Sequence, residues 1–265
     1  MVKPLKINDY LQPRPKPSGI DVVSKLQHFA IITYAVDARR FEGIFSTRFK
    51  LDTVSIGGEE KGLISVVPFM DVDFTSAVFP FPRFTMGQTN YRIYILDKAT
   101  GERCVWFIGT TLDSWTVFVP RHVWKLPWHA GTVGFDCVFD PQTGRYQRYV
   151  MHTESQWAPA HVELTQPDNE SFRPEGFPDI ETALVYLTHP LTGFYYRRDR
   201  KVGTYKVWHK QLDVRPAQLT SAWFGLLERL GLVSAAEQLS PHSVLLQPMN
   251  EFTIYLPPRV LNSEI

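Results

Sequence analysis

Alternation of apolar and polar residues typical of β-strands dominates the chain. Nine segments are rich in Val, Ile, Thr, Tyr, Phe and Trp: residues 62–73, 89–97, 103–110, 133–140, 145–153, 159–166, 193–198, 203–212 and 243–256. Three links between them (97–102, 140–145 and 198–203) carry a glycine, which supplies the positive φ that a short turn needs. The pattern predicts a mainly antiparallel barrel or a strongly curved sheet.

Two segments favour helices instead. In residues 37–45 an aspartate stands at the start, where it can cap a helix, and three apolar residues then share one face. In residues 216–230 Leu and Trp repeat at helical spacing, with Pro216 early and Gly231 directly after the last leucine. The expected class is therefore α+β, mainly β with a few helices packed on the barrel.

Proline marks two places where the organisation changes. Residues 1–19 hold four prolines and several Lys and Arg, which predicts an extended N-terminal arm, either disordered or laid over the surface. Residues 166–179 are also proline-dense and polar, but strand-like segments continue on both sides. We interpret them as a long loop, so that residues 20–265 form a single domain.

Charge and hydropathy exclude several classes of partner. Lys and Arg number 28 against 27 Asp and Glu, a net charge of +1, which argues against nucleic acid or an anionic membrane surface. No apolar run approaches the roughly 20 residues of a membrane span, and the N-terminus lacks the apolar core of a secretory signal. A cytoplasmic protein is expected.

Common catalytic motifs are absent from the sequence. It contains no G-x-S-x-G, no Walker A lysine loop, no G-x-G-x-x-G after a strand and no H-E-x-x-H. The eight histidines have no ligand spacing, although strands could bring His152, His161 and His209 together. Cys104 and Cys137 each sit in an apolar strand and are expected to be inert. Neither a metal site nor a cofactor is predicted.

The most unusual local sequence is VPRHVWKLPWHAG at residues 119–131, which places Lys125, Trp128 and His129 around a proline. Such a turn has the ingredients of a pocket rim, where a lysine in apolar surroundings loses its proton more readily and becomes a nucleophile. The alternative is that this segment forms no site: Trp124 and Trp128 belong to the hydrophobic core, and the side chains of Arg121 and Lys125 are solvated.

A second candidate is a polar strand face. Gln88, Asn90, Arg92 and Tyr94 share one face, and the opposite face is apolar. If the apolar face packs outward, the polar face lines a barrel interior and can bind a ligand; otherwise it is a wet surface. By the same alternation His209 falls on an inner face, as a ligand contact or a core histidine.

Several blocks resemble known families. Residues 29–54 (FAIITYAVDARRFEGIFSTRFKLDTV) resemble the opening of the acetoacetate decarboxylase superfamily. Three further blocks resemble the YqjF-like family of uncharacterised proteins: MGQTNYRIYIL, CVWFIGTTLDSWTVFVPRHVWKLPWHAG and YLTHPLTGFYYRRDRKVGTYKVWHKQL. That family is itself similar in fold to acetoacetate decarboxylase. The blocks span residues 25–260 in collinear order. The resemblance implies a double-layered, cone-like antiparallel barrel with a central cavity.

The resemblance also implies lost chemistry. Acetoacetate decarboxylase forms a Schiff base on a lysine that directly follows a proline. In the matching stretch WKLPWH, Trp128 stands at that position and His129 at that of the neighbouring lysine. Gln27 and Gln88 stand where the resemblance places an arginine and an acidic residue. Because an indole cannot form an imine, the resemblance implies that Schiff-base chemistry is gone.

Three functions follow as hypotheses. The first is a protein that binds a small, carboxylated, apolar or aromatic molecule in the barrel cavity, with Arg92 on the carboxylate and His129 or His209 as acid or base. Its expected lining residues are Gln88, Asn90, Arg92, Trp128, His129 and His209.

The second hypothesis is a lyase, decarboxylase or hydratase that acts on keto acids, with Lys125 as a relocated nucleophile. The third is a structural or interaction protein with a filled cavity. Homo-oligomers are common in this superfamily, and the late strand FTIYL suits either a buried interface or core.

Overall fold

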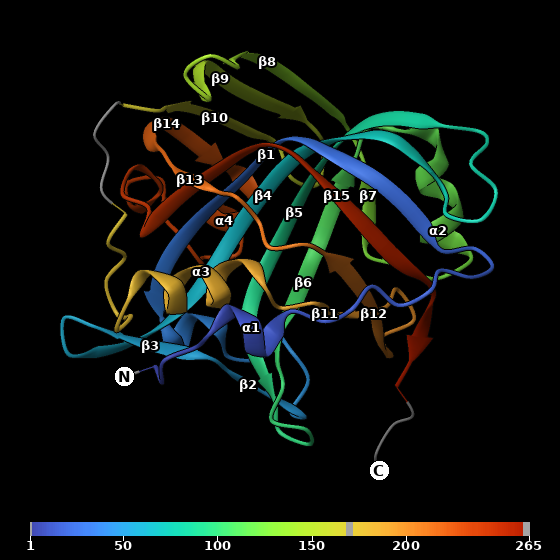
Figure 1. Cartoon of the computed structure of the whole chain (residues 1–265). Coiled ribbons are helices and arrows are strands. Elements are labelled where there is room, and N and C mark those ends of the chain that lie inside the picture. The colour runs from blue at the N-terminus through green and yellow to red at the C-terminus, as the bar shows by residue number, and fades with distance from the viewer. Residues whose placement is uncertain (1, 168–171, 262–265) are drawn as a thin grey trace.

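Seven strands close into a barrel in the computed structural model, which describes residues 2–167 and 172–261 (Figure 1). In order around the ring they are β5 (Phe84–Asp97), β4 (Glu59–Ser76), β1 (Val22–Asp37), β15 (Ser243–Val260), β12 (Val202–His209), β11 (Thr192–Tyr196) and β6 (Arg103–Leu112). Pairing of β5 with β6 closes the ring. Neighbours are antiparallel, except that β11 and β6 are parallel.

Short strands extend this barrel at its edges. Among the described residues β2 (Phe49–Leu51) pairs with β5, β3 (Thr53–Ile56) with β4, β7 (Trp128–Ala130) with β6, and β13 (Arg215–Pro216) with β15.

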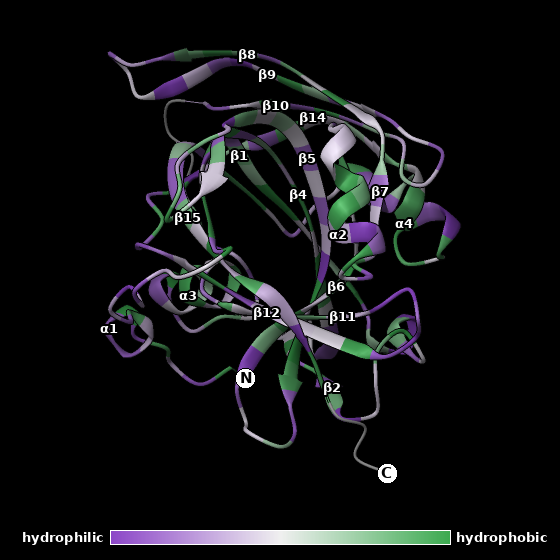
Figure 2. Cartoon of the chain, turned by 90° about the vertical axis from the view of Figure 1, so that its right-hand side faces the viewer, coloured by the Kyte–Doolittle hydropathy of each residue, from purple (hydrophilic) through white to green (hydrophobic). Residues whose placement is uncertain are grey.

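A second sheet packs on the outside of the barrel wall, at the top of Figure 2. Its strands, in spatial order, are β14 (Gln218–Phe224), β10 (Ala160–Thr165), β9 (Arg145–Glu154) and β8 (Thr132–Asp140). The mainly β, double-layered architecture expected from the sequence is therefore confirmed.

Helices are short and peripheral. They are α1 (Ile7–Tyr10), α2 (Phe118–His122), α3 (Ile180–Thr188) and α4 (Gly225–Arg229), with single turns of 3-10 helix at Ala38–Phe41, Trp115–Val117 and Glu237–Leu239. Among the described residues, none is both long and apolar enough to cross a membrane. The N-terminal arm carries α1 and packs onto the body of the protein, because Val2 and Leu5 are buried.

Two helix predictions were wrong in extent. Most of residues 216–230 forms β14, which pairs with β10, and only α4 is helical. Trp223, assigned to the apolar helical stripe, is instead largely exposed, and its indole nitrogen donates to Glu228 at 3.1 Å. In residues 37–45 a single 3-10 turn forms, capped by Asp37 as expected.

Helix α3 was missed. Its sequence, IETALVYLT, is rich in β-branched residues, which masks its helical character. The start is set by Asp179, whose carboxylate accepts a 2.7 Å hydrogen bond from the backbone nitrogen of Thr182. The backbone oxygen of Leu187 in this helix accepts a 2.8 Å hydrogen bond from Arg92 of β5.

Strand β5 separates two hydrophobic cores. Its apolar face, Tyr91, Ile93 and Ile95, belongs to the core that includes residues of the second sheet, such as Met151 and Val162. The opposite face therefore points into the barrel. This settles the choice between a wet surface and an inner wall in favour of the inner wall.

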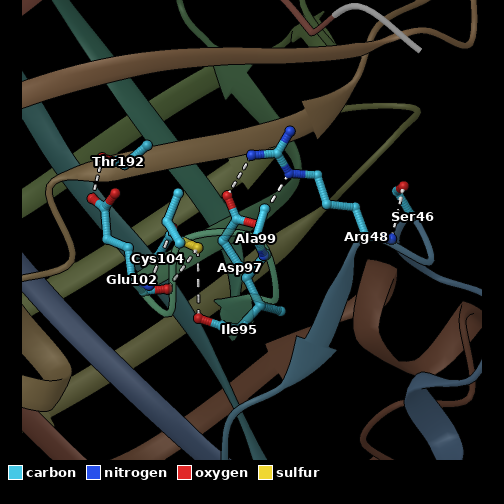
Figure 3. Close-up of polar contacts among 9 residues, drawn as sticks. Ser46, Arg48, Ile95, Asp97, Ala99, Glu102, Cys104 and Thr192 are labelled. Atoms are coloured by element: carbon cyan, nitrogen blue, oxygen red, sulfur yellow. Dashed lines mark hydrogen bonds and ion pairs between the residues drawn. The ribbon is translucent and has the colours of Figure 1, made fainter. Parts of the chain in front are cut away.

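Polar contacts fix the β5–β6 hairpin (Figure 3). Arg48 donates to both carboxylate oxygens of Asp97 at 3.0 and 2.6 Å, and Glu102 accepts from Thr192 at 2.7 Å. Between them Cys104 is buried, and this burial raises the pKa of its thiol to about 12. Burial also raises the pKa of Cys137 to about 12. Both thiols are protonated at neutral pH, as expected for inert cysteines.

Candidate functional site

A cavity of about 260 Å³ lies inside the barrel. This volume is close to the lower end of the range for ligand pockets, roughly 300–1,000 Å³, and far exceeds the roughly 30 Å³ that one water occupies. Its wall is mostly apolar and aromatic, including Phe29, Phe69, Phe107, Leu112, Trp128 and Phe252. Two of its lining residues, Ile20 and Val119, are about half exposed to solvent.

Three polar side chains of β5 line the cavity: Gln88, Asn90 and Arg92, here called the polar row. The amide oxygen of Asn90 accepts from Gln88 Nε2 at 2.9 Å and from Thr110 Oγ1 at 2.7 Å. These bonds hold the first two members of the row in place along the wall.

Arg92 brings a positive charge to the cavity. Its Nη2 donates to the backbone oxygen of Leu187 in α3 at 2.8 Å and to the hydroxyl of Tyr94 at 3.3 Å. The Nε of Arg92 is buried and has no hydrogen-bond partner among the described residues. Within the described residues no carboxylate forms an ion pair with this guanidinium, so its positive charge has no protein counter-ion there.

His209 lines the cavity as a neutral ring. It is 4% exposed, its Nδ1 lies 2.7 Å from the backbone oxygen of Lys210, and its ring centroid is 4.4 Å from that of Phe252. Burial lowers the pKa of His209 to about 3. At neutral pH this histidine therefore offers hydrogen bonding without charge.

Trp128 also lines the cavity, whereas its neighbour His129 does not. Successive residues of β7 point to opposite sides, so the His129 ring stacks on Trp157 outside the cavity, with centroids 4.0 Å apart. Burial, reinforced by the positive charge of Arg121, lowers the pKa of His129 to about 4.

Lys125 lies outside the lining as well. Its backbone adopts a left-handed φ of 58°, and its neighbours Trp124 and Leu126 contribute to the wall instead. In the part of the chain that the structure describes, no lysine lines the cavity. Gln27 is also absent from the lining, where its neighbour Leu26 stands.

Sequence reasoning missed one charged group in the wall, Asp71 of β4. It is 1% exposed, and its Oδ1 accepts a 2.7 Å hydrogen bond from Ser24 Oγ. Its Oδ2 is buried without a partner among the described residues, and burial raises the pKa of the carboxyl to about 7. The signal was present, because Asp71 alternates in register with the apolar Val67 and Phe69.

Solved structures similar to this chain include an acetoacetate decarboxylase and an acetoacetate decarboxylase-like enzyme. An acetoacetate decarboxylase-like enzyme from Sphingomonas wittichii RW1 aligns with a TM-score of 0.56 and 9% identity, over 93% of this chain and 95% of that one. The acetoacetate decarboxylase of Legionella pneumophila aligns with a TM-score of 0.53 and 13% identity, over 99% and 98%. At these identities the likeness shows the fold alone.

Family membership comes from the sequence. No curated protein matches the chain. The model of the DUF2071 family, described as an uncharacterized conserved protein, matches residues 24–249. The resemblance noted in the sequence is thereby confirmed, and the chain belongs to the DUF2071 family with an acetoacetate decarboxylase-like fold.

Proposed function

We propose that this protein binds a small carboxylic acid with an apolar body in the barrel cavity, and that it does so without forming a Schiff base. One observation carries the proposal: Arg92 faces an apolar cavity of about 260 Å³ and has no carboxylate partner among the described residues. We place this function in the cytoplasm, as expected from the sequence.

A ligand carboxylate is the group best suited to supply the counter-charge and the hydrogen bond that Arg92 lacks among the described residues. A guanidinium binds carboxylates through parallel N–H bonds, and burying its charge unpaired is costly. The described part of the chain supplies a partner for Nη2 of Arg92 but none for the buried Nε. A carboxylate that accepts from Nε would supply both the missing hydrogen bond and the missing charge.

The apolar wall defines the rest of the ligand. Phe69, Phe107 and Phe252 stand around the same cavity, so an aliphatic or aromatic body would be removed from water on binding. Each buried methylene contributes roughly 0.8 kcal/mol. Hydrogen bonds from Gln88 and Asn90 would select among ligands that carry a further polar group.

Noncovalent binding is proposed because no described residue with a side-chain amine lines the cavity. Trp128 stands where the resemblance places the reactive lysine, and Lys125 lies outside the lining. From the names of the similar structures we carry over only the expectation that the ligand is a small carboxylic acid.

Isothermal titration calorimetry with straight-chain and phenyl-substituted monocarboxylates tests the proposal. Arg92→Ala should weaken the binding of every acid that binds by at least tenfold. Arg39→Ala is the matched control, since Arg39 is exposed and pairs with Asp37 away from the cavity. Unchanged affinity in Arg92→Ala, or binding of the corresponding primary amides as tightly as the acids, would overturn it.

A further inference from the structure

The carboxyl of Asp71 is an unsatisfied polar group in an otherwise apolar part of the cavity wall. Hydrogen bonding to Ser24 uses only one of its oxygens, and the other is buried without a partner among the described residues. Buried polar atoms are almost always hydrogen-bonded, so an exception that lines a cavity points to a missing ligand group. Asp73, two residues further along, faces solvent and already pairs with Lys25.

Asp71 and Arg92 stand at opposite ends of the same cavity. Asp71 pairs with Met86 of β5, and Arg92 follows six residues later on that strand. At roughly 3.3 Å per residue the two positions are about 20 Å apart along the strand. Gln88 and Asn90, the other two members of the polar row, lie between these positions on β5 and line the cavity. Among the described residues the two side chains form no ion pair with each other, since Asp71 bonds to Ser24 and Arg92 to Leu187 and Tyr94.

The cavity therefore has two separate charged side chains that could bind a ligand: Arg92 for an anionic group and Asp71 for a cationic group. Resting on the function proposed above, we infer that the ligand carries an amine at the end remote from its carboxylate, and that the amine donates a hydrogen bond to Oδ2 of Asp71. The ligand class is thus an ω-amino acid with an apolar spacer.

Local surroundings favour an amine over a second neutral group. The residues paired with Asp71 across the sheet are Leu26 on β1 and Met86 on β5, and neither carries a charge. Desolvation by these neighbours destabilises the carboxylate, so a bound cation gains more from Asp71 than a hydroxyl does. A purely structural role, in which Asp71 only ties β4 to Ser24 on β1, would leave Oδ2 unexplained.

Two homologous series of ligands test the inference. Calorimetry would compare ω-amino acids from 6-aminohexanoate to 12-aminododecanoate with the alkanoates of equal length. At the optimal length the amino acid should bind wild-type protein at least tenfold more tightly than its alkanoate. Asp71→Asn should abolish that difference, because the amide carries no negative charge to pair with the ligand amine. Asp73→Asn, the control, should preserve the difference.

The outcomes separate this inference from the function on which it rests. Equal affinity of the two series, or a preference for the amine that survives in Asp71→Asn, overturns the inference and leaves carboxylate binding standing. Failure of both series to bind overturns both. If Asp71→Asn does not fold, the wild-type length dependence decides. Two fixed ends predict a sharp optimum among the amino acids, and a steady gain with length in both series would contradict it.

Discussion

His129 and Trp157 stack face to face, with ring centroids 4.0 Å apart and planes 5° apart, on the side of β7 that faces away from the cavity. The preceding residue, Trp128, faces the cavity. The two residues that the resemblance places at the paired lysines of the decarboxylase therefore lie on opposite sides of one strand. Trp128 can contact a ligand in the cavity, whereas His129 packs against Trp157.

The stack predicts a pH dependence of stability. Burial lowers the pKa of His129 to about 4, below the ordinary value of 6.5, so the unfolded chain binds the proton more readily. The stability contributed by neutral His129 is complete above pH 6.5 and is lost as pH falls toward 4. His129→Phe keeps the stack without the titration, and urea unfolding should show a weaker loss of stability between pH 6.5 and 4. An unchanged slope would contradict this account.

Asp71 predicts the opposite slope. Its pKa is raised to about 7 from 3.8, so the native state binds the proton more tightly than the unfolded chain. Its destabilising effect is absent below pH 4, grows as pH rises, and levels off above pH 7 at no more than about 4 kcal/mol. The difference in unfolding free energy between wild type and Asp71→Asn, measured at pH 5 and pH 8, should shift in favour of the variant at pH 8. The same difference at both pH values would exclude a perturbed carboxyl.

Trp128 predicts where imine chemistry can be restored. Wild-type protein incubated with acetoacetate or pyruvate and cyanoborohydride should show no covalent mass increment, since no lysine among the described residues lines the cavity. Trp128→Lys places an amine in an apolar wall and should acquire the increment of the reduced imine at residue 128. An increment on Lys125 of the wild type would instead support relocated lysine chemistry.

Tyr94 is predicted to position Arg92. Its hydroxyl donates to Leu187 O at 3.0 Å, lies 2.9 Å from Ser65 Oγ, and accepts from Arg92 Nη2. Tyr94→Phe should lower the unfolding free energy by about 1–3 kcal/mol, because buried polar partners lose a bond. Alkanoate affinity should fall by less than in Arg92→Ala, and the loss should be absent in a double variant that lacks Arg92. A further loss in that double variant would mean that Tyr94 contacts the ligand itself.

The strand period explains what the sequence could predict about the site. Alternation along residues 88–94 places Gln88, Asn90 and Arg92 on one face, because successive side chains of any strand point to opposite faces of the sheet. Which face points inward depended on the second sheet, whose strands lie between residues 132 and 224. No local pattern carries that information, so the alternatives stayed open until the fold was known.

At other positions the local sequence pattern predicts the wrong structure, or does not by itself indicate a functional group. The predicted rim gathered Lys125, Trp128 and His129 into one site, although a left-handed residue and strand alternation separate them. The apolar spacing of residues 216–230 favoured a helix, but pairing with β10 draws most of the segment into a strand. Asp71 was visible as an acid on an apolar strand face. Its significance depends on Oδ2 having no partner, which only the packing reveals.

In the function proposed here, a ligand carboxylate binds Arg92 noncovalently inside the barrel. The most direct test is the Nε–H resonance of Arg92 in nitrogen-15 NMR, assigned by its loss in Arg92→Lys, during titration with octanoate. We predict a saturable shift of this resonance with the same dissociation constant that calorimetry gives. Saturation of the calorimetric signal while the Arg92 resonance stays in place would contradict the claim.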